Sequence, residues 1–338
     1  MNPKRRDILK STGLMILGGF MPGISQSQKL EVSGQSMGTR YLLKLHTAQS
    51  VSLDDLKLDV DSILARVDSR MSLYREDSEL SRFNNHRSTG WQALSADTRQ
   101  VLDRALHIQR ISGGAFNPLV RPLLKHWGFG ADAEPLLPRP VSPEIEVIRG
   151  VAKGRLELNE FAARKSRPDL GVDLNAIAKG YAVDQVAGML RARGIESYMF
   201  ELGGEVICGS PAGQPAPWRI GILGPRQKLT TLVRPGNAAV ATSGDHLQFF
   251  LYNNRRYSHL LNPASGEPVK HRLALVSTIM SGAMLADAWS TALMVMGPHA
   301  GWQLAREQDI AALFVVRDTH GFREFRTPGF ESFEVKNI

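Results

Sequence analysis

Apolar residues recur at helical spacing in several stretches of the chain. The clearest is 53–67, where leucine, isoleucine and valine return every three or four residues, so we expect an amphipathic helix there. Ser95 precedes a second such stretch and is a suitable N-terminal cap. The predicted helices cover 53–67, 95–111, a short run ending at Trp127 after a turn at 113–118, 176–190, and the nearly wholly apolar 281–296.

Short apolar runs bounded by turn residues predict a comparable number of strands. A hairpin is expected over 30–45, with its break at 36–39. The other predicted strands are 147–148, 155–158, 168–174, 198–202, 206–208, 218–222, 237–242, 248–251, 274–280 and 311–316. Because strands and helices mix without a strict βαβ rhythm, the fold class is predicted to be α+β.

Length and composition are those of an ordinary globular protein. The chain has 338 residues, of which 43% are hydrophobic and 22% charged. We expect a single domain over 26–338, and the proline-rich stretch 132–143 is interpreted as an irregular surface excursion and not a domain boundary. Cys208 is the one cysteine, which excludes an internal disulfide, and it is expected to be a small core residue.

The net charge of +8 is scattered along the chain. No block of basic residues is interleaved with aromatic residues, so binding of nucleic acid has little support. Four basic residues and one acidic residue lie in 4–10, so the chain would carry about +5 without its N-terminus (8 − 4 + 1). A mildly basic body suits a phosphate-bearing ligand, as it does many other partners.

Residues 1–25 are interpreted as an export signal. Arg5 and Arg6 are followed by two apolar positions and Lys10, which resembles the twin-arginine signature, and an apolar region follows at 14–21. That region is too short to span a bilayer, so no stable membrane span is expected. The predicted location is the bacterial periplasm; the alternative is a basic amphipathic N-terminal helix.

The stretch 171–184 is the most informative part of the chain. Asp173 or Asn175 is expected to cap the helix that follows, and a helix N-terminus favours an anion, to which Lys179 could add its charge. Gly180 costs about 1 kcal/mol inside a helix, which suggests close backbone packing or a ligand. Taken alone, the stretch is also compatible with an ordinary capped helix on a sheet.

Three further residues could carry chemistry. Asp287 and Thr291 lie four residues apart among apolar neighbours, so both face one side of a helix. A carboxylate in such surroundings needs a partner, which could be Mg²⁺ with the threonine hydroxyl as a second ligand, or an arginine or backbone group. His259 could act as an acid or base, although a lone histidine is more often structural.

Nine short segments, taken in order, resemble the FAD:protein FMN transferases of the ApbE family. The resemblance extends over nearly all of the chain after the export signal. The segments are 37–39, 71–84, 114–117, 127–130, 173–184, 201–205, 242–245, 259–266 and 286–291.

The resemblance implies a mixed fold that binds FAD in a cleft between two closely associated subdomains. It implies a Mg²⁺-dependent enzyme that cleaves FAD, attaches FMN to a threonine or serine hydroxyl of a partner flavoprotein, and releases AMP. Contacts with FAD are implied for Met37, Tyr74, Ala115, Phe116, Asn117, Asp173, Lys179 and Leu261. The carbonyl of Ala176 with Asp287 and Thr291 would hold Mg²⁺, and His259 would take the proton of the acceptor hydroxyl.

The chain departs from the family pattern at two positions. Asn117 stands where aspartate is usual, and Asn175 where glycine is common. Two other functions stay open: an FAD pyrophosphatase that gives FMN and AMP, and a non-catalytic FAD carrier. The acceptor is expected to be a membrane or periplasmic flavoprotein, for example a respiratory-chain component.

Overall fold

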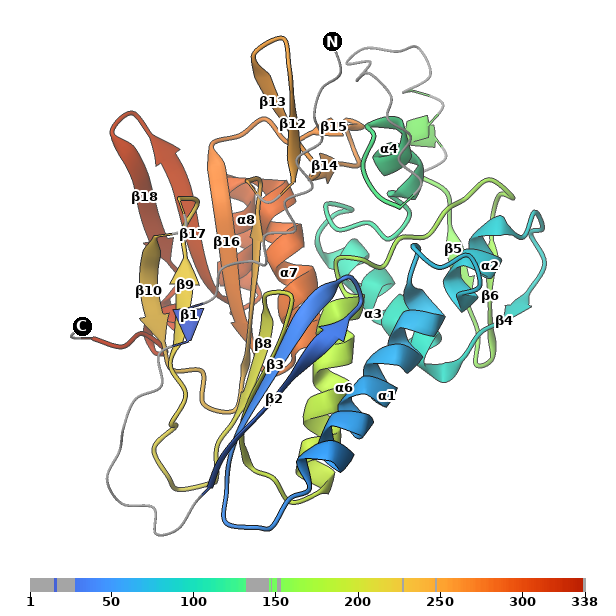
Figure 1. Ribbon diagram of the computed structural model, residues 1–338. Helices are drawn as coiled ribbons and strands as arrows, with labels where there is room; N and C mark the ends of the chain where they lie inside the picture. The colour runs from blue at the N-terminus through green and yellow to red at the C-terminus, as the bar shows by residue number, and fades with distance from the viewer. Residues whose placement is uncertain are drawn as a thin grey trace, which may run out of the picture.

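A central antiparallel sheet organises the computed structural model of this protein, which describes residues 15–16, 28–131, 146, 148–150, 153–226, 228–246 and 248–336. Eight strands form the sheet in the order β18-β17-β16-β11-β8-β7-β3-β2 (Figure 1). In chain order they are β2 Gln28–Ser36, β3 Thr39–Thr47, β7 Ser197–Leu202, β8 Glu205–Gly209, β11 Ala239–Gly244, β16 Leu273–Met280, β17 Ala311–Asp318 and β18 Gly321–Arg326. The predicted α+β class is confirmed.

Both faces of the central strands are buried, which explains why their sequences are nearly continuous apolar runs. Along β7, Phe200 packs into the larger core cluster and its neighbour Met199 into a second cluster on the opposite face. Val240 and Ala241 of β11 divide in the same way. Cys208 is a buried free thiol of the second cluster, as predicted.

Helices cover one face of the sheet. Figure 1 shows α1, α6 and α7 side by side against it, and α2, α3 and α4 further along the same side. The helices are α1 Leu53–Met71, α2 Glu79–Asn85, α3 Ala96–Ile111, α4 Arg121–His126, α6 Ala178–Ala192, α7 Ala283–Met296, α8 Pro298–Glu307 and α9 Pro328–Glu331. In the described part of the chain, no helix is both long and apolar enough to cross a membrane.

Small sheets complete the fold. A three-stranded sheet, β1-β9-β10, contributes residues to the second core cluster, and another, β4-β6-β5, lies beside α2. Two hairpins, β12-β13 and β14-β15, stand near α4. The bounds are β1 Met15–Ile16, β4 Gln92–Ala93, β5 Leu156–Leu158, β6 Ala162–Lys165, β9 Ile220–Leu223, β10 Leu229–Val233, β12 Phe249–Tyr252, β13 Arg255–Ser258, β14 Leu261–Asn262 and β15 Glu267–Pro268.

Some predicted elements were wrong. Residues 168–174 form no strand, because Asn84 holds Val172 through both of its backbone groups (2.8 and 2.7 Å) and replaces a strand partner. Ile148 is helical and not extended. The export signal, apart from 15–16, and the proline-rich stretch 132–143 lie outside the described residues.

Candidate functional site

A buried ion pair joins the first turn of α6 to the start of β8. The ammonium of Lys179 lies 2.6 Å from Oε1 of Glu205, whose side chain is only 6% exposed. The second carboxylate oxygen, Oε2, is buried without a hydrogen-bond partner among the described residues. Such an oxygen is costly unless something binds it.

Asp287 adds a second buried carboxylate to this group. Only 5% of the residue is exposed, and its Oδ2 accepts a hydrogen bond from the backbone N–H of Gly180 (3.3 Å). Burial raises the pKa of Asp287, against the attraction of Lys179. The sequence left open an arginine or a backbone group as the partner of Asp287. The arginine is therefore wrong, whereas the backbone group is confirmed.

Burial opposes ionisation of both carboxyl groups near Lys179. Burial raises the pKa of Glu205 to about 8, and the charge of Asp287 adds to this rise while Lys179 opposes it. Burial alone would lower the pKa of Lys179, but the charges of Glu205 and Asp287 outweigh it and the pKa is raised. One ammonium thus serves two carboxyl groups that burial shifts toward their protonated forms, and a divalent cation would favour their ionised forms.

The close approach of α6 and α7 creates this arrangement. A Cβ atom on Gly180 would lie 2.3 Å from the carbonyl oxygen of Ala283, so only glycine allows the two helices to touch here. Asp184, one turn further along α6, accepts hydrogen bonds from the N–H groups of Ala283 (2.7 Å) and Met284 (2.9 Å). Asp184 therefore caps α7, and close packing is confirmed as the reason for Gly180.

Two further oxygen atoms complete a possible metal site. The N–H of Gly180 bonds to Asp287, so the Ala176 carbonyl, its usual helical partner, receives no backbone hydrogen bond in the described structure. The hydroxyl of Thr291, one turn after Asp287, lies 2.9 Å from that of Ser243. One carboxylate, one hydroxyl and one free carbonyl are oxygen ligands of the kind that Mg²⁺ takes.

No cluster of three or more histidine, cysteine, aspartate or glutamate side chains suited to a metal occurs among the residues with described positions. A metal held by Ala176, Asp287 and Thr291 would use only one such side chain. The donor set therefore favours a hard cation over zinc or another soft metal.

The predicted cap of α6 is wrong in detail. Ile177 occupies the cap position and offers no side-chain acceptor. Asp173 instead accepts hydrogen bonds from the backbone and side-chain N–H groups of Asn175 (2.7 and 3.3 Å). The asparagine that departs from the family pattern thus holds the carboxylate of Asp173 in place.

The turn between β2 and β3 places Met37 at the end of the sheet where the ion pair lies. Met37 and Gly38 both have positive φ (50° and 71°), as a two-residue hairpin turn requires. The N–H of Gly203, in the β7–β8 turn, donates to the Arg40 carbonyl (3.3 Å), and a Cβ atom on Gly203 would lie 2.8 Å from Thr39. Since Glu205 opens β8, this contact brings Met37 and the ion pair to the same end of the sheet.

The α3–α4 loop supplies the next group of predicted residues. The N–H of Asp173 donates to the Pro118 carbonyl (2.8 Å), which joins Asp173 to the segment Ala115, Phe116 and Asn117. The Asn117 side-chain oxygen accepts hydrogen bonds from Gln109 (2.9 Å) and from the N–H of Leu119 (2.8 Å), roles an aspartate could also fill. Tyr74, after α1, is 72% exposed and presents an open aromatic ring.

Leu261 and His259 belong to a separate aromatic cluster. Leu261 is buried in a cluster with Leu123 of α4 and Trp127, which directly follows that helix. The His259 ring packs edge-on to Phe129, and its Nδ1 lies 3.0 Å from the Gln248 carbonyl. Burial lowers the pKa of His259, although the Gln248 carbonyl opposes it. Within the described structure, His259 forms no hydrogen bond to Asp287 or Thr291.

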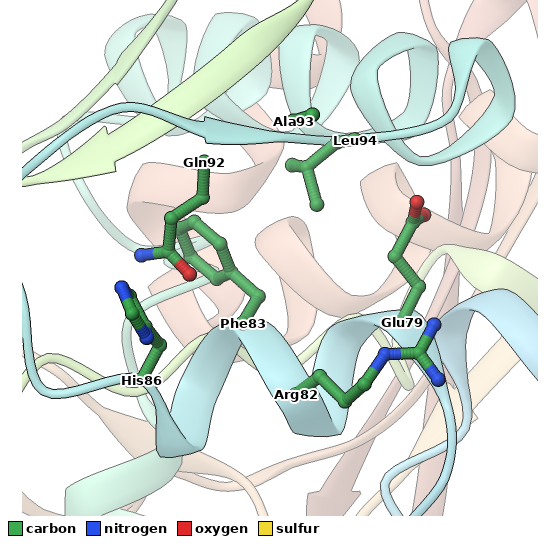
Figure 2. A pocket seen from close by; sticks show the side chains of 7 residues that line it. All are labelled: Glu79, Arg82, Phe83, His86, Gln92, Ala93 and Leu94. Atoms are coloured by element: carbon green, nitrogen blue, oxygen red, sulfur yellow. The ribbon is translucent and has the colours of Figure 1, made fainter.

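A cavity of about 230 Å³ lies elsewhere, between α2 and β4. Figure 2 shows its lining, which contains no predicted site residue: Glu79, Arg82, Phe83, His86, Gln92, Ala93 and Leu94. Glu79 accepts hydrogen bonds from the N–H and hydroxyl of Ser95 (2.7 and 2.8 Å), at the start of α3. This carboxylate is therefore already used to hold α3.

Sequence reasoning missed two contributors to the site. Glu205 lay in a recognised segment, directly after a pair of glycines, but was assigned no role. Ser243 contacts Thr291 from β11, a contact between residues 48 positions apart. The glycine pair was the available signal for Glu205, and the recognised segment 242–245 was the available signal for Ser243.

Comparison with known proteins identifies close relatives. The profile of the ApbE family matches residues 37–314. The FAD:protein FMN transferase of Vibrio cholerae is 36% identical over 98% of this chain and all of its own length (100%). That of Haemophilus influenzae is 32% identical over 88% of this chain and 89% of its own.

Solved structures agree with these relatives. The flavin transferase ApbE from Vibrio cholerae has a TM-score of 0.83 at 36% identity, over 91% of this chain and 99% of its own. The apo form of the Pseudomonas stutzeri flavinyl transferase ApbE has a TM-score of 0.84 at 34% identity, over 94% of this chain and 100% of its own.

Proposed function

Because this chain belongs to the ApbE family, we propose that it transfers FMN from FAD to a hydroxyl group of a partner protein. The acceptor residue is a threonine or serine, AMP is the leaving group, and Mg²⁺ is required. The observation that carries this proposal is the buried group of Lys179, Glu205 and Asp287, which places two carboxyl groups around one ammonium, near the Ala176 carbonyl and the Thr291 hydroxyl.

Mg²⁺ would be held by the Ala176 carbonyl, the Asp287 carboxylate and the Thr291 hydroxyl. When bound, the ion neutralises charge on a pyrophosphate and so favours cleavage of its P–O bond. Gly180 and Asp184 hold α6 against α7, so the ligands from the two helices keep a fixed separation. Such pre-positioning reduces the reorganisation needed during the reaction.

FAD would lie where two groups of predicted residues meet, one near the ion pair and the other near α4. Met37 comes from the β2–β3 turn, Lys179 from the first turn of α6, and Asp173 from the segment before α6. Ala115, Phe116, Asn117 and Leu261 come from the α3–α4 loop and β14, and Tyr74 offers an exposed ring for stacking. Lys179 keeps its positive charge, which suits an anionic phosphate or a flavin carbonyl.

The reaction exchanges the phosphoanhydride bond of FAD for a phosphoester bond. The acceptor hydroxyl oxygen attacks the phosphorus of the FMN half, a new P–O bond forms, and the bond to the AMP phosphate breaks. The hydroxyl proton passes to His259, whose lowered pKa keeps the ring neutral and able to accept it at neutral pH. AMP leaves with the electron pair of the broken bond.

The acceptor would be an envelope protein. The twin-arginine-like segment at 1–25 supports export to the periplasm, where a membrane or periplasmic flavoprotein, such as a respiratory-chain component, would meet the enzyme. Localisation of the full chain by cell fractionation, with Arg5 and Arg6 replaced by lysine as the control, tests this part separately.

The first experiment is covalent labelling. Purified protein, FAD and Mg²⁺ are incubated with an envelope extract from bacteria that lack this enzyme, and labelled proteins are detected by in-gel flavin fluorescence and mass spectrometry. We expect a mass gain of one FMN on a threonine or serine, abolished by EDTA and by Asp287→Ala. Glu160→Ala, which removes an exposed carboxylate, is the matched control and should label normally.

Other outcomes would overturn the proposal. AMP and free FMN without any labelled protein would identify a pyrophosphatase that uses water as the acceptor. Bound FAD with neither product, unaffected by Asp287→Ala, would identify a carrier.

A further inference from the structure

The hairpin of β12 and β13 stands apart from the main sheet. Its strands pair only with each other among the described residues, so each leaves one edge of backbone groups unpaired. Asn253 and Asn254 form a tight turn with positive φ (47° and 57°). Figure 1 shows the hairpin projecting beyond the end of the central sheet.

One face of the hairpin is packed and the other is open. Phe250 and Tyr257 stack on each other (5.2 Å between ring centres), and Phe250 also stacks on Phe129 (5.4 Å). On the opposite face, Phe249 and Leu251 are 45% and 69% exposed, and the guanidinium of Arg256 lies 5.1 Å from the ring centre of Phe249. The exposed apolar residues alternate with the packed ones, as expected for a strand with one face available to a partner.

Ion pairs fix the hairpin in position. Asp245 is 7% exposed and binds Arg256 of β13 (2.6 Å) as well as both terminal nitrogens of Arg317 (2.7 and 2.6 Å). Arg255, next to the turn, lies on the same face as Tyr257 and places its guanidinium 5.5 Å from the ring centre of that residue. The hairpin is thus a rigid surface with a positive charge near its tip.

The base of this hairpin leads directly to His259. The Gln248 carbonyl, just before β12, accepts a hydrogen bond from the N–H of His259 (3.1 Å), which continues the ladder of the hairpin by one residue. A peptide that paired with a hairpin edge would therefore extend along the strand direction toward the proposed base.

We propose that the β12–β13 hairpin is the docking surface for the acceptor protein. This inference rests on the proposed function and identifies the partner of the same site. The occupant is an extended segment of the acceptor that adds as a strand to the hairpin edge, covers Phe249 and Leu251 with apolar side chains, and presents a carboxylate to Arg255. The hydroxyl that receives FMN follows this segment and reaches His259.

The test compares two leucines of equal exposure. Leu251→Asp places a charge on the hairpin, and Leu58→Asp does the same on α1, where the leucine is 68% exposed. The acceptor is the protein identified by covalent labelling with the wild-type enzyme, then purified. We expect Leu251→Asp to reduce labelling at limiting acceptor at least tenfold, while FAD binding, followed by flavin fluorescence, changes less than twofold. Leu58→Asp should match wild type in both.

Arg255→Ser provides a second variant that leaves the apolar face intact. It should weaken labelling and reduce the sensitivity of labelling to salt, because one exposed charge contact is removed. Since FAD binding is measured for every variant, a misfolded hairpin would be recognised by a loss of both properties, and Phe249→Ser would then replace Leu251→Asp.

Three results would overturn the inference. Equal labelling by Leu251→Asp and Leu58→Asp would show that the acceptor docks elsewhere. Conversion of a dimer into a monomer by Leu251→Asp, with labelling unchanged, would make a second copy of this chain the occupant. Loss of binding to phosphatidylglycerol vesicles with unchanged labelling would make it a membrane surface. Absence of labelling by the wild-type enzyme would instead contradict the proposed function.

Discussion

The role of Lys179 depends on its ion pair with Glu205. Its side chain is 29% exposed and lies 2.6 Å from Glu205, which is almost fully buried. Removing one partner of a buried ion pair leaves an uncompensated charge, which is far more costly than the pair itself is stabilising. Lys179 and Glu205 should therefore be regarded as one unit, in which the glutamate orients the lysine toward its ligand.

His259 offers a test by pH. Burial lowers its pKa below the ordinary value of 6.5, so the neutral ring persists to lower pH. We expect the acid limb of the rate of FMN transfer to lie below pH 6.5, because activity falls only when His259 becomes protonated.

His259→Gln should lower the rate by a factor of about 10² to 10⁴ and remove this acid limb, as measured by labelling between pH 5 and 8. His320→Gln, which replaces an exposed histidine, is the control and should keep the wild-type profile. An unchanged acid limb in His259→Gln would show that another group accepts the proton.

The sequence singled out the candidate metal ligands more readily than their surroundings. Asp287 and Thr291 were recognisable because a carboxylate and a hydroxyl recur one helical turn apart in an apolar stretch. Glu205 was not, because its importance arises from burial against a lysine 26 residues away. Burial and pairing are properties of the folded chain, and a single sequence does not display them.

At the scale of elements, α6 and α7 form the support of the site. The long periodic helices were predicted within a few residues, since their apolar spacing alone specifies them. The extended segment 168–174 was mistaken for a strand because its hydrogen bonds go to the Asn84 side chain, a partner that no local pattern indicates. Local patterns predicted the helices and most strands of the central sheet, but they did not show that a side chain replaces the strand partner of this segment.

Two glycines of α6 allow the helix contact to be tested. Gly180→Ala places a methyl group 2.3 Å from the Ala283 carbonyl, whereas nothing lies within 4 Å of the equivalent position at Gly188. Overpacking of this kind costs about 1–3 kcal/mol. We expect Gly180→Ala to lower the free energy of unfolding by about 2 kcal/mol and to reduce activity, because Asp287 moves with α7.

The matched variant, Gly188→Ala, should change the free energy of unfolding in the opposite direction. Gly188→Ala gains helix propensity without a clash and should raise the free energy of unfolding by up to about 1 kcal/mol. Urea denaturation of both variants provides the measurement. Similar effects of the two substitutions would mean that helix propensity, and not close packing, governs α6.

At the scale of the whole molecule, the sheet and its helices bury carboxylates that stay exposed in the unfolded chain. Burial raises the pKa of Glu205 from 4.5 to about 8, so the folded protein binds a proton there that the unfolded chain has lost. The contribution of this group to stability is therefore complete below pH 4.5 and declines as the pH rises toward 8.

Buried histidines change stability with pH in the opposite direction, and they do so over a lower pH range. Burial lowers the pKa of His46, His246, His259 and His271, so each reduces stability only when the pH falls below about 6.5. Between pH 6.5 and 8 the effect of Glu205 ionisation on stability can thus be measured without a contribution from these histidines. Over this range wild type should lose up to about 2 kcal/mol relative to Glu205→Gln, which cannot ionise.

Thermal and urea unfolding of the two proteins in EDTA at several pH values would test this expectation. If the stabilities of wild type and Glu205→Gln changed with pH in the same way, Glu205 would already be ionised in the folded protein at pH 6.5. Mg²⁺ should reverse the trend in wild type, because the ion binds ionised carboxylates and stabilises by about 2.7 kcal/mol at a hundred times its Kd. The same negative charge that destabilises the metal-free protein is then what prepares the site to bind a cation.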